Sequence, residues 1–174
     1  MGGIFPNETT IFIGTADQVT TALCHSSNAV VGEIEKFGLS GGNQDVESVP
    51  VIGGFVDKEK PREQFEVSFD VIVANTSAST FDRWDTLKFG TALTSAGEGA
   101  NKAIAIVMNS NGASPYKVYA FNNVKAVTWE PEMNADDMLR GTITFKFSPT
   151  TSLGAPNLKT STVTTSTAFP TSWS

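Results

Sequence analysis

The chain has 174 residues, a net charge of −6 and a charged fraction of 17%, which is low for a globular protein, where about 25% is usual. This length fits one domain, residues 1–174, and the acidic balance excludes tight binding of nucleic acid, which depends on basic side chains that neutralise phosphates. A single cysteine excludes an intrachain disulfide, and neither a basic leader nor a run of ~18 apolar residues is present to predict an export signal or a membrane span.

The predicted elements begin with a weakly patterned N-terminal segment, residues 1–29, in which only "TIFIG" (10–14) has the character of a strand. The predicted core, residues 30–149, starts with a second strand, "VVGEIEKFGLS" (30–40).

A long loop between two strands is predicted over residues 39–63. Its stretch "GLSGGNQDVESVPVIGG" invites a phosphate or calcium site, but the glycine spacing of a phosphate cradle and the alternating acids of a calcium loop are both absent. Loops longer than ~12–15 residues are usually functional or disordered. Because the apolar "VPVIGGFV" (49–56) would not favour free solvent, we expect this loop to contact a partner surface.

The clearest strand is "FEVSFDVIV" (65–73), in which apolar residues alternate with Glu66, Ser68 and Asp70. A single helix follows over about residues 79–89. Phe81, Trp84 and Leu87 are apolar and spaced three apart, and we expect Trp84 to pack in the core. Ser79 and Asp82 are placed as a capping box, and Gly90 is placed to end the helix.

The second half of the chain alternates between strands and turns. Strands are predicted over residues 102–109, 116–123, 124–131 and 141–147, with turns over 109–115 and 130–137. Six or seven strands and one helix predict a mainly β protein, an antiparallel β-sandwich or barrel with one flanking α-helix and a long inter-strand loop. The Ser/Thr-rich C-terminal arm, residues 150–174, is β-branched enough to become a strand where a sheet edge is offered.

Signals of catalysis are weak in this sequence. His25, the only histidine, is next to Cys24, and adjacent side chains diverge on a strand or a helix, so a Cys–His dyad is geometrically poor. Pro131 between Glu130 and Glu132 predicts a turn with solvated acids rather than a carboxylate pair. No nucleophile elbow or zinc constellation occurs, and we predict no enzymatic activity, no cofactor and no metal site.

Residues 38–73 and the following helix resemble the major tail tube protein of long-tailed, siphovirus-like bacteriophages. The similar features are a glycine-rich segment with Asp-Val-Glu, a Gly-Gly before a charged stretch with Lys-Pro, and the alternating strand. The resemblance implies the phage tail tube fold, in which sheets of six subunits join around a ring and rings stack into a tube. It implies a structural virion protein of the tail, assembled in the host cytoplasm, that serves as a conduit for DNA ejection.

The same resemblance implies the partners and the contact residues. The protein would bind other copies of itself, a tape-measure protein, and tail tip and tail terminator proteins; DNA would pass without specific binding, and no membrane is involved. The inter-subunit role falls on Gly41, Gly42, Asp45, Glu47, Val51, Ile52 and Phe55 of the loop. We expect Glu66, Ser68 and Asp70 to face the lumen, since nine acids and four bases between residues 33 and 70 favour an electronegative lumen or a charge-matched interface.

Two other functions are compatible with the sequence. A tube-forming protein of a contractile secretion machine is similar in fold and ring symmetry. A β-sandwich module that binds carbohydrate or a cell surface would show the same strands, with exposed aromatic residues such as Tyr116 and Trp129.

Overall fold

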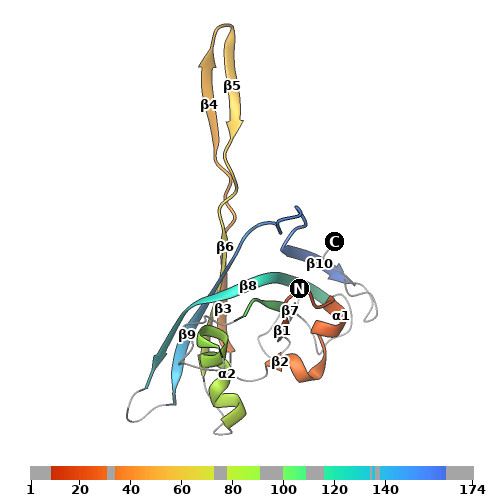
Figure 1. The fold of residues 1–174 in the computed structure, drawn as a ribbon, viewed down its shortest axis with the longest axis vertical. Coiled ribbons are helices and arrows are strands. Elements are labelled where there is room, and N and C mark those ends of the chain that lie inside the picture. The colour runs from red at the N-terminus through yellow and green to blue at the C-terminus, as the bar shows by residue number, and fades with distance from the viewer. Residues whose placement is uncertain are drawn as a thin grey trace, which may run out of the picture.

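The computed structural model describes residues 9–30, 34–72, 78–90, 100–108, 116–133, 135 and 138–163, without the side chains of 78–83, 116 and 163. It shows a mainly β body of antiparallel strands from which one long hairpin projects (Figure 1). The predicted fold class is therefore confirmed. The elements are β1 (Thr9–Thr15), α1 (Thr20–Leu23), β2 (Ala29–Val30), β3 (Ile34–Gly41), β4 (Val46–Val51), β5 (Gly54–Glu59), β6 (Phe65–Ile72), α2 (Ala78–Phe89), β7 (Lys102–Met108), β8 (Tyr116–Glu132), β9 (Arg140–Phe147) and β10 (Leu158–Val163), with a 3₁₀ turn at Ser26–Asn28.

The body is one sheet of eight strands folded into two layers. The strand order is β2-β1-β7-β8-β9-β6-β3, with β10 added to β8. We call β2, β1, β7, β10 and the N-terminal half of β8 the first layer, and β3, β6, β9 and the C-terminal half of β8 the second layer. The strand β8 belongs to both layers because it bends in the middle, where Asn123 has a φ of 53°.

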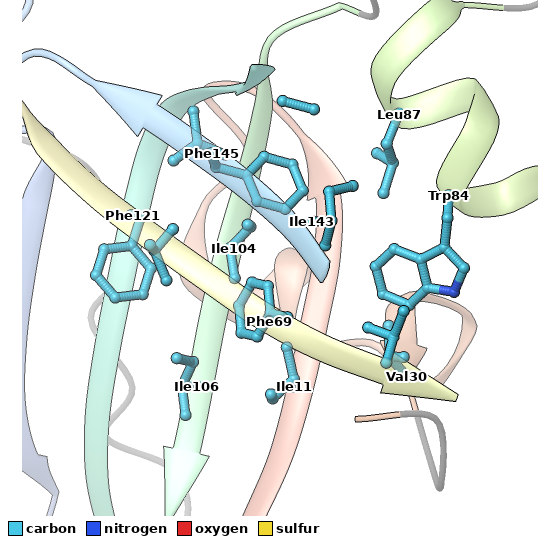
Figure 2. Packing of buried hydrophobic residues seen from close by; sticks show 14 of the residues in the cluster. Ile11, Val30, Phe69, Trp84, Leu87, Ile104, Ile106, Phe121, Ile143 and Phe145 are labelled. Carbon is cyan, nitrogen blue, oxygen red and sulfur yellow. The ribbon is translucent and has the colours of Figure 1, made fainter. Parts of the chain in front are cut away.

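The main core lies between the two layers and is built from alternate residues of the strands. Side chains of β1, β6, β7, β8 and β9 interdigitate there, and α2 closes one side (Figure 2). The largest buried members are Trp84, Phe69, Phe121, Phe145, Ile104, Ile106, Ile143, Val67 and Val71. Since Val67, Phe69 and Val71 of β6 point into this core, the alternate residues of β6 face outward.

The strand β7 is buried on both faces, which explains why its sequence "KAIAIVM" does not alternate. Ile104 and Ile106 face the main core, whereas Ala103 and Ala105 pack with Leu23 of α1 on the outer face of the first layer. The helix α1 was not predicted, because four residues are too few to show helical periodicity.

The helix α2 and its core tryptophan are as predicted. Trp84 is fully buried and its ring stacks on Trp129 of β8 with centroids 6.3 Å apart. The Trp129 indole N–H donates to Asp85 Oδ1 over 2.7 Å, which fixes α2 on β8. Gly90 ends the helix with a φ of 78°, and its N–H donates to the Thr86 carbonyl. The capping box predicted at Ser79 and Asp82 involves side chains outside the described part.

Two predictions about β8 are wrong. The strands expected at 116–123 and 124–131 are one strand of 17 residues, and the turn expected at 130–137 begins later because β8 continues to Glu132. Pro131 lies directly opposite Gly141 of β9, so Glu130 and Glu132 are exposed strand residues rather than loop acids. The turn expected at 109–115 lies outside the described residues.

The C-terminal arm is partly a strand of the chain's own sheet. Residues of β10 pair with β8 from Leu158 opposite Phe121 to Val163 opposite Tyr116. The part of the arm that forms β10 therefore adds as a strand to the sheet of its own chain. Residues 164–174 lie outside the described part.

Candidate functional site

The segment predicted as a long loop at 39–63 does connect two strands, β3 and β6, but most of it forms a β-hairpin of its own, which was not predicted. Its strands β4 and β5 pair only with each other among the described residues, and the hairpin extends far from the body (Figure 1). Every residue from 43 to 64 is exposed. We call residues 42–64 the arm.

The base of the arm is held by two glycines at the end of β3. Gly41 and Gly42 have φ angles of 81° and 70°, which side chains rarely adopt. A Cβ at Gly41 would clash with the Gln64 carbonyl oxygen, and a Cβ at Gly42 would clash with the Phe65 ring. The Gly42 N–H also donates to the Gln64 carbonyl over 3.2 Å. These glycines therefore allow two chain segments to lie in close contact where the arm leaves the body.

The shaft of the arm is polar and satisfies many of its charges internally. Lys60 Nζ lies 2.9 Å from Asp45 Oδ2 and 3.9 Å from Glu47 Oε2. Ser48 Oγ donates to Asp57, across the two strands. The two acids predicted to bind a neighbouring subunit, Asp45 and Glu47, therefore already have a lysine partner within the arm.

The tip of the arm, residues 49–56, is apolar on its surface. Ile52 at the turn is fully exposed, Phe55 is 75% exposed and Val56 is 55% exposed. Val49 and Val51 are also exposed. Because soluble proteins rarely leave a contiguous group of large apolar side chains in water, the tip is a candidate contact surface.

The seven residues predicted for an inter-subunit contact lie at three levels, namely where the arm joins β3, on its shaft and at its tip. Gly41 and Gly42 lie at the base and Asp45 and Glu47 on the shaft. Three residues are at the tip, namely Val51, Ile52 and Phe55. Val49 and Val56 were not among the predicted contact residues, although both belong to the apolar run 49–56.

The second layer presents a polar outer face, which includes the predicted residues Glu66, Ser68 and Asp70. The two predicted acids are paired: Lys146 Nζ lies 3.4 Å from Glu66 Oε2, and Lys36 Nζ lies 3.9 Å from Asp70 Oδ2. The outer face is therefore polar with balanced charge, rather than the strongly acidic surface that the count of acids suggested.

Further partners on this face were missed from sequence. The Thr142 hydroxyl donates to Asp70 Oδ1 over 2.9 Å, and Arg140 Nη1 lies 2.8 Å from Glu35 Oε2. Side chains of β9 alternate between the two sides of the sheet, so Thr142 and Lys146 lie on the side away from the buried Ile143. This alternation could have assigned both residues to the outer face. The pairing with β6 depends on register, which the sequence does not give.

The second layer has two open edges in the described structure. Its four strands run in the order β8-β9-β6-β3, where β3 pairs only with β6 and the C-terminal half of β8 pairs only with β9. An open strand edge presents unpaired backbone groups that accept another strand. The layer can therefore be extended on both sides by further chains.

The residues considered for catalysis do not converge. Cys24 packs beside Phe12 against apolar residues of the first layer. The His25 ring instead lies at the exposed surface, where Nδ1 is 2.9 Å from Ser27 Oγ. Among the described residues no group of three or more His, Cys, Asp or Glu side chains is arranged to hold a metal ion. In the same residues, no helix has the length and apolar character needed to cross a membrane.

Two hollows of the described surface also lack a catalytic constellation. One, of about 410 Å³, lies between β1 and α2 and is lined by uncharged side chains and Lys102. The other, of about 650 Å³, contains Asp17 as its only carboxylate. That carboxylate accepts a hydrogen bond from Asn122 Nδ2 over 2.8 Å and is part of the structure of the β8 bend.

The Cys24 thiol should react slowly with thiol reagents. Burial in apolar surroundings raises the pKa of Cys24 to about 11 from its ordinary 9.0, because the thiolate loses hydration. At pH 8 the folded protein should hold about a hundredfold less thiolate than the unfolded chain. The rate of reaction with a disulfide reagent, measured with and without urea, checks this expectation. Equal rates in both conditions would contradict it.

Comparison with known proteins supports the fold. No family model and no curated protein matches the sequence. The chain is similar to solved chains of the PVC extracellular contractile injection system. A chain of its sheath–tube complex is 14% identical with a TM-score of 0.55, covering 92% of this chain and 93% of that one. A chain of its sheath/tube terminator is 12% identical with a TM-score of 0.57, covering 92% and 98%.

The tube-terminating cap of the anti-feeding prophage is similar as well. A chain of that cap is 11% identical with a TM-score of 0.56, and the match covers 94% of this chain and 93% of that one. At these identities the likeness concerns the fold, and it extends over nearly the whole chain. This protein has the tail-tube-like fold found in components of contractile injection systems.

Proposed function

We propose that the protein is a structural subunit of a tail-like tube, in which copies close into rings and the rings stack. The exposed apolar tip of the arm carries this proposal, because it is a contact surface without a partner in the single chain. The fold, similar over nearly its whole length to components of injection systems, supports it.

In this proposal the second layer lines the channel. Its open edges on β3 and β8 allow four strands of each subunit to continue into the next subunit. Its outer face carries ion-paired acids, Glu66 and Asp70, and the hydroxyl of Ser68. Such a face is hydrated, and its acids and bases of both signs give little net attraction for a passing polymer. Sixfold symmetry is proposed because the sequence resembles hexameric tail tubes and a similar chain belongs to a sixfold-symmetrised baseplate.

A tube within a contractile injection machine is favoured over a siphovirus tail tube. The similar structures belong to contractile injection systems, and one of them is a complex of sheath and tube. A sheath protein, a terminator and a baseplate are then the proposed partners, beside other copies of this chain. In the siphovirus alternative, the partners are the tape-measure, tip and terminator proteins, and the cargo is DNA.

The carbohydrate-binding module has less support. Trp129, one of its two proposed aromatic residues, is half-buried against Trp84 and donates its indole N–H to Asp85. The side chain of Tyr116 lies outside the described part. A ring engaged in this way does not offer a flat face to a sugar.

Assembly of the purified protein tests the proposal. Concentrated protein should form rings or hollow tubes in negative-stain micrographs and elute early from a sizing column. A protein that stays monomeric at all concentrations and binds a glycan array would overturn the tube assignment.

The lining of the channel is tested by protection of Ser68. In a Cys24→Ser background, Ser68→Cys should react with maleimide coupled to a large polymer when the protein is dissociated and resist it in tubes. Equal labelling of Ser68→Cys in intact and dissociated tubes would place the polar face outside.

A further inference from the structure

The outer face of the second layer separates its charges into levels along the strands. At the level nearest the arm, Glu66 of β6 lies opposite Lys146 of β9, and Lys146 lies opposite Lys125 of β8. These side chains point outward because residues next to them along each strand are buried in the core, namely Val67, Val124, Ala126, Phe145 and Phe147. This level has two lysines and one glutamate, and we call it the basic band.

The next level along the strands is uncharged. It consists of one residue from each strand of the layer, namely Gly38, Ser68, Thr144 and Thr128. Its hydroxyl groups can both donate and accept hydrogen bonds, so this level has no preference for anions or cations. It separates the basic band from the other charged groups of the face.

The levels farther from the arm are acidic, and we call them the acidic band. They hold four carboxylates and two basic groups, which are Glu35, Asp70, Glu130, Glu132, Lys36 and Arg140. Both basic groups lie within 4 Å of a carboxylate, Lys36 at 3.9 Å from Asp70 and Arg140 at 2.8 Å from Glu35. Because carboxylates outnumber basic groups, this band has a net negative charge.

The two bands are far enough apart to act as separate surfaces. Lys146 of the basic band and Thr142 of the acidic band are four residues apart on β9, which corresponds to about 13 Å at the rise of an antiparallel strand. The Debye length is roughly 8 Å at physiological salt, so an ion at one band is largely screened from the other. A face whose total charge is nearly balanced can therefore still attract an anion at one level.

The basic band contains a contact that costs the fold stability. Lys125 and Lys146 lie directly opposite each other across two strands, where like charges destabilise a sheet. Glu66, 3.4 Å from Lys146, is the only carboxylate at this level of the four paired strands. A further carboxylate between the two ammonium groups would relieve their repulsion and accept charge-assisted hydrogen bonds from both. The lysine pair is therefore suited to bind an anionic group.

The pattern of bands favours a short acidic segment of polypeptide over DNA as the partner. Duplex DNA carries one charge about every 1.7 Å of its axis, so a duplex on this face would also lie along the acidic band, which has the larger net charge. Three consecutive acidic residues span only about 10 Å when extended, less than the separation of the bands. Such a segment can lie at the basic band without reaching the acidic one.

We propose that Lys125 and Lys146 form a binding site for short acidic segments of a polypeptide inside the channel. This inference rests on the proposed function, which places the face inside a tube, whereas the lysine pair itself is present in the single chain. In a tube the site would recur once in every subunit, so each ring would hold an acidic segment at the same level.

Binding of a hexaglutamate peptide tests the inference, first on the single chain and then on assembled tubes. Changes in amide NMR shifts of the single chain, measured at 0.1 M salt, give the affinity and should centre on Lys125 and Lys146. Replacing both by serine should weaken binding more than about tenfold, because the two ammonium groups that donate to the carboxylates are lost. Dye-labelled hexaglutamate that sediments with tubes measures the same site in the assembly.

The matched control is Lys36→Ser. It removes the same charge from the same face, but from the acidic band, where the Lys36 side chain is 75% exposed. We expect this variant to bind hexaglutamate as the wild type does. The serine variants should also melt close to the wild-type temperature, because surface ion pairs contribute little to stability and the contact between like charges is removed.

Other outcomes separate this inference from the proposed function. A wild type that forms tubes but binds no hexaglutamate, or that loses as much binding through Lys36→Ser, would overturn the inference and leave the tube assignment standing. Binding that depends on Lys125 and Lys146 in a chain that never assembles would support the lysine site and overturn the tube. A DNA duplex of about 20 base pairs should not displace the peptide, since it also meets the acidic band. Displacement by the duplex would overturn the choice of a polypeptide.

Discussion

A chain in which residues 46–59 are replaced by Asn-Gly should fold, close into rings and form no tubes. The Lys60 N–H donates to the Asp45 carbonyl over 2.9 Å, so these two residues already lie opposite each other and accept a two-residue turn. The replaced residues are all exposed, and we expect the free energy of unfolding to change by less than about 1 kcal/mol.

The effect on assembly should be large because the whole apolar tip is removed. Full burial of one Val, Ile or Phe side chain stabilises by about 1.5–3 kcal/mol, and the tip has several of them. Electron microscopy and sedimentation measure the loss of tubes, and thermal melting checks the fold. Tubes of normal length from the shortened chain would show that the arm does not hold the rings together.

Replacement of Trp84 by alanine should cause the largest loss of stability among single substitutions, about 3–5 kcal/mol. Trp84 is fully buried in the main core, and its ring stacks on Trp129. Alanine would leave a cavity between α2 and β8, and a helix of 12 residues depends on such contacts for its stability. Urea denaturation followed by circular dichroism measures the change.

The control for this prediction is Trp84→Phe. The buried Trp84 indole N–H has no hydrogen-bond partner among the described residues. Phenylalanine therefore removes this donor without breaking a hydrogen bond. We expect this variant to lose less than half of what the alanine variant loses. Similar losses for both variants would indicate that ring size and stacking on Trp129, rather than burial, set the stability.

The strands that alternate and the helix with apolar spacing could be predicted from the sequence. β6 was predicted because Val67, Phe69 and Val71 face a core while Glu66 and Asp70 face outward. In these elements the local pattern and the tertiary environment agree, which is the condition under which periodicity is informative.

The bend of β8 could not be predicted, because its turn residues are stabilised by distant partners. Asn122 is buried and its side chain bonds with Asp17, 105 residues away in sequence. The Asn123 side chain donates to Asn157 Oδ1 over 3.1 Å. Locally, two consecutive asparagines favour a turn, and only the folded contacts show why the strand continues through them.

The hairpin structure of the arm could not be predicted because its strands lack a local pattern. It has no body layer beneath it, so its strands show no alternation between buried and exposed residues. The partner surface expected for 49–56 was argued from composition alone, and the pairing of β4 with β5 explains how this run is presented as a tip. The ion pair between Glu66 and Lys146 could not be predicted either, because it depends on the register between two strands that are distant in sequence.

The sharing of β8 between both layers has a mechanical consequence. Relative sliding of the layers would have to tear hydrogen bonds from one continuous strand that pairs with β7, β9 and β10. The body should therefore resist shear as a stiff block. The close contacts of Gly41 and Gly42 at the base of the arm transmit load from this block instead of acting as a loose joint. Thrust along a stack of such subunits would be carried through the strands rather than absorbed by deformation of each sandwich.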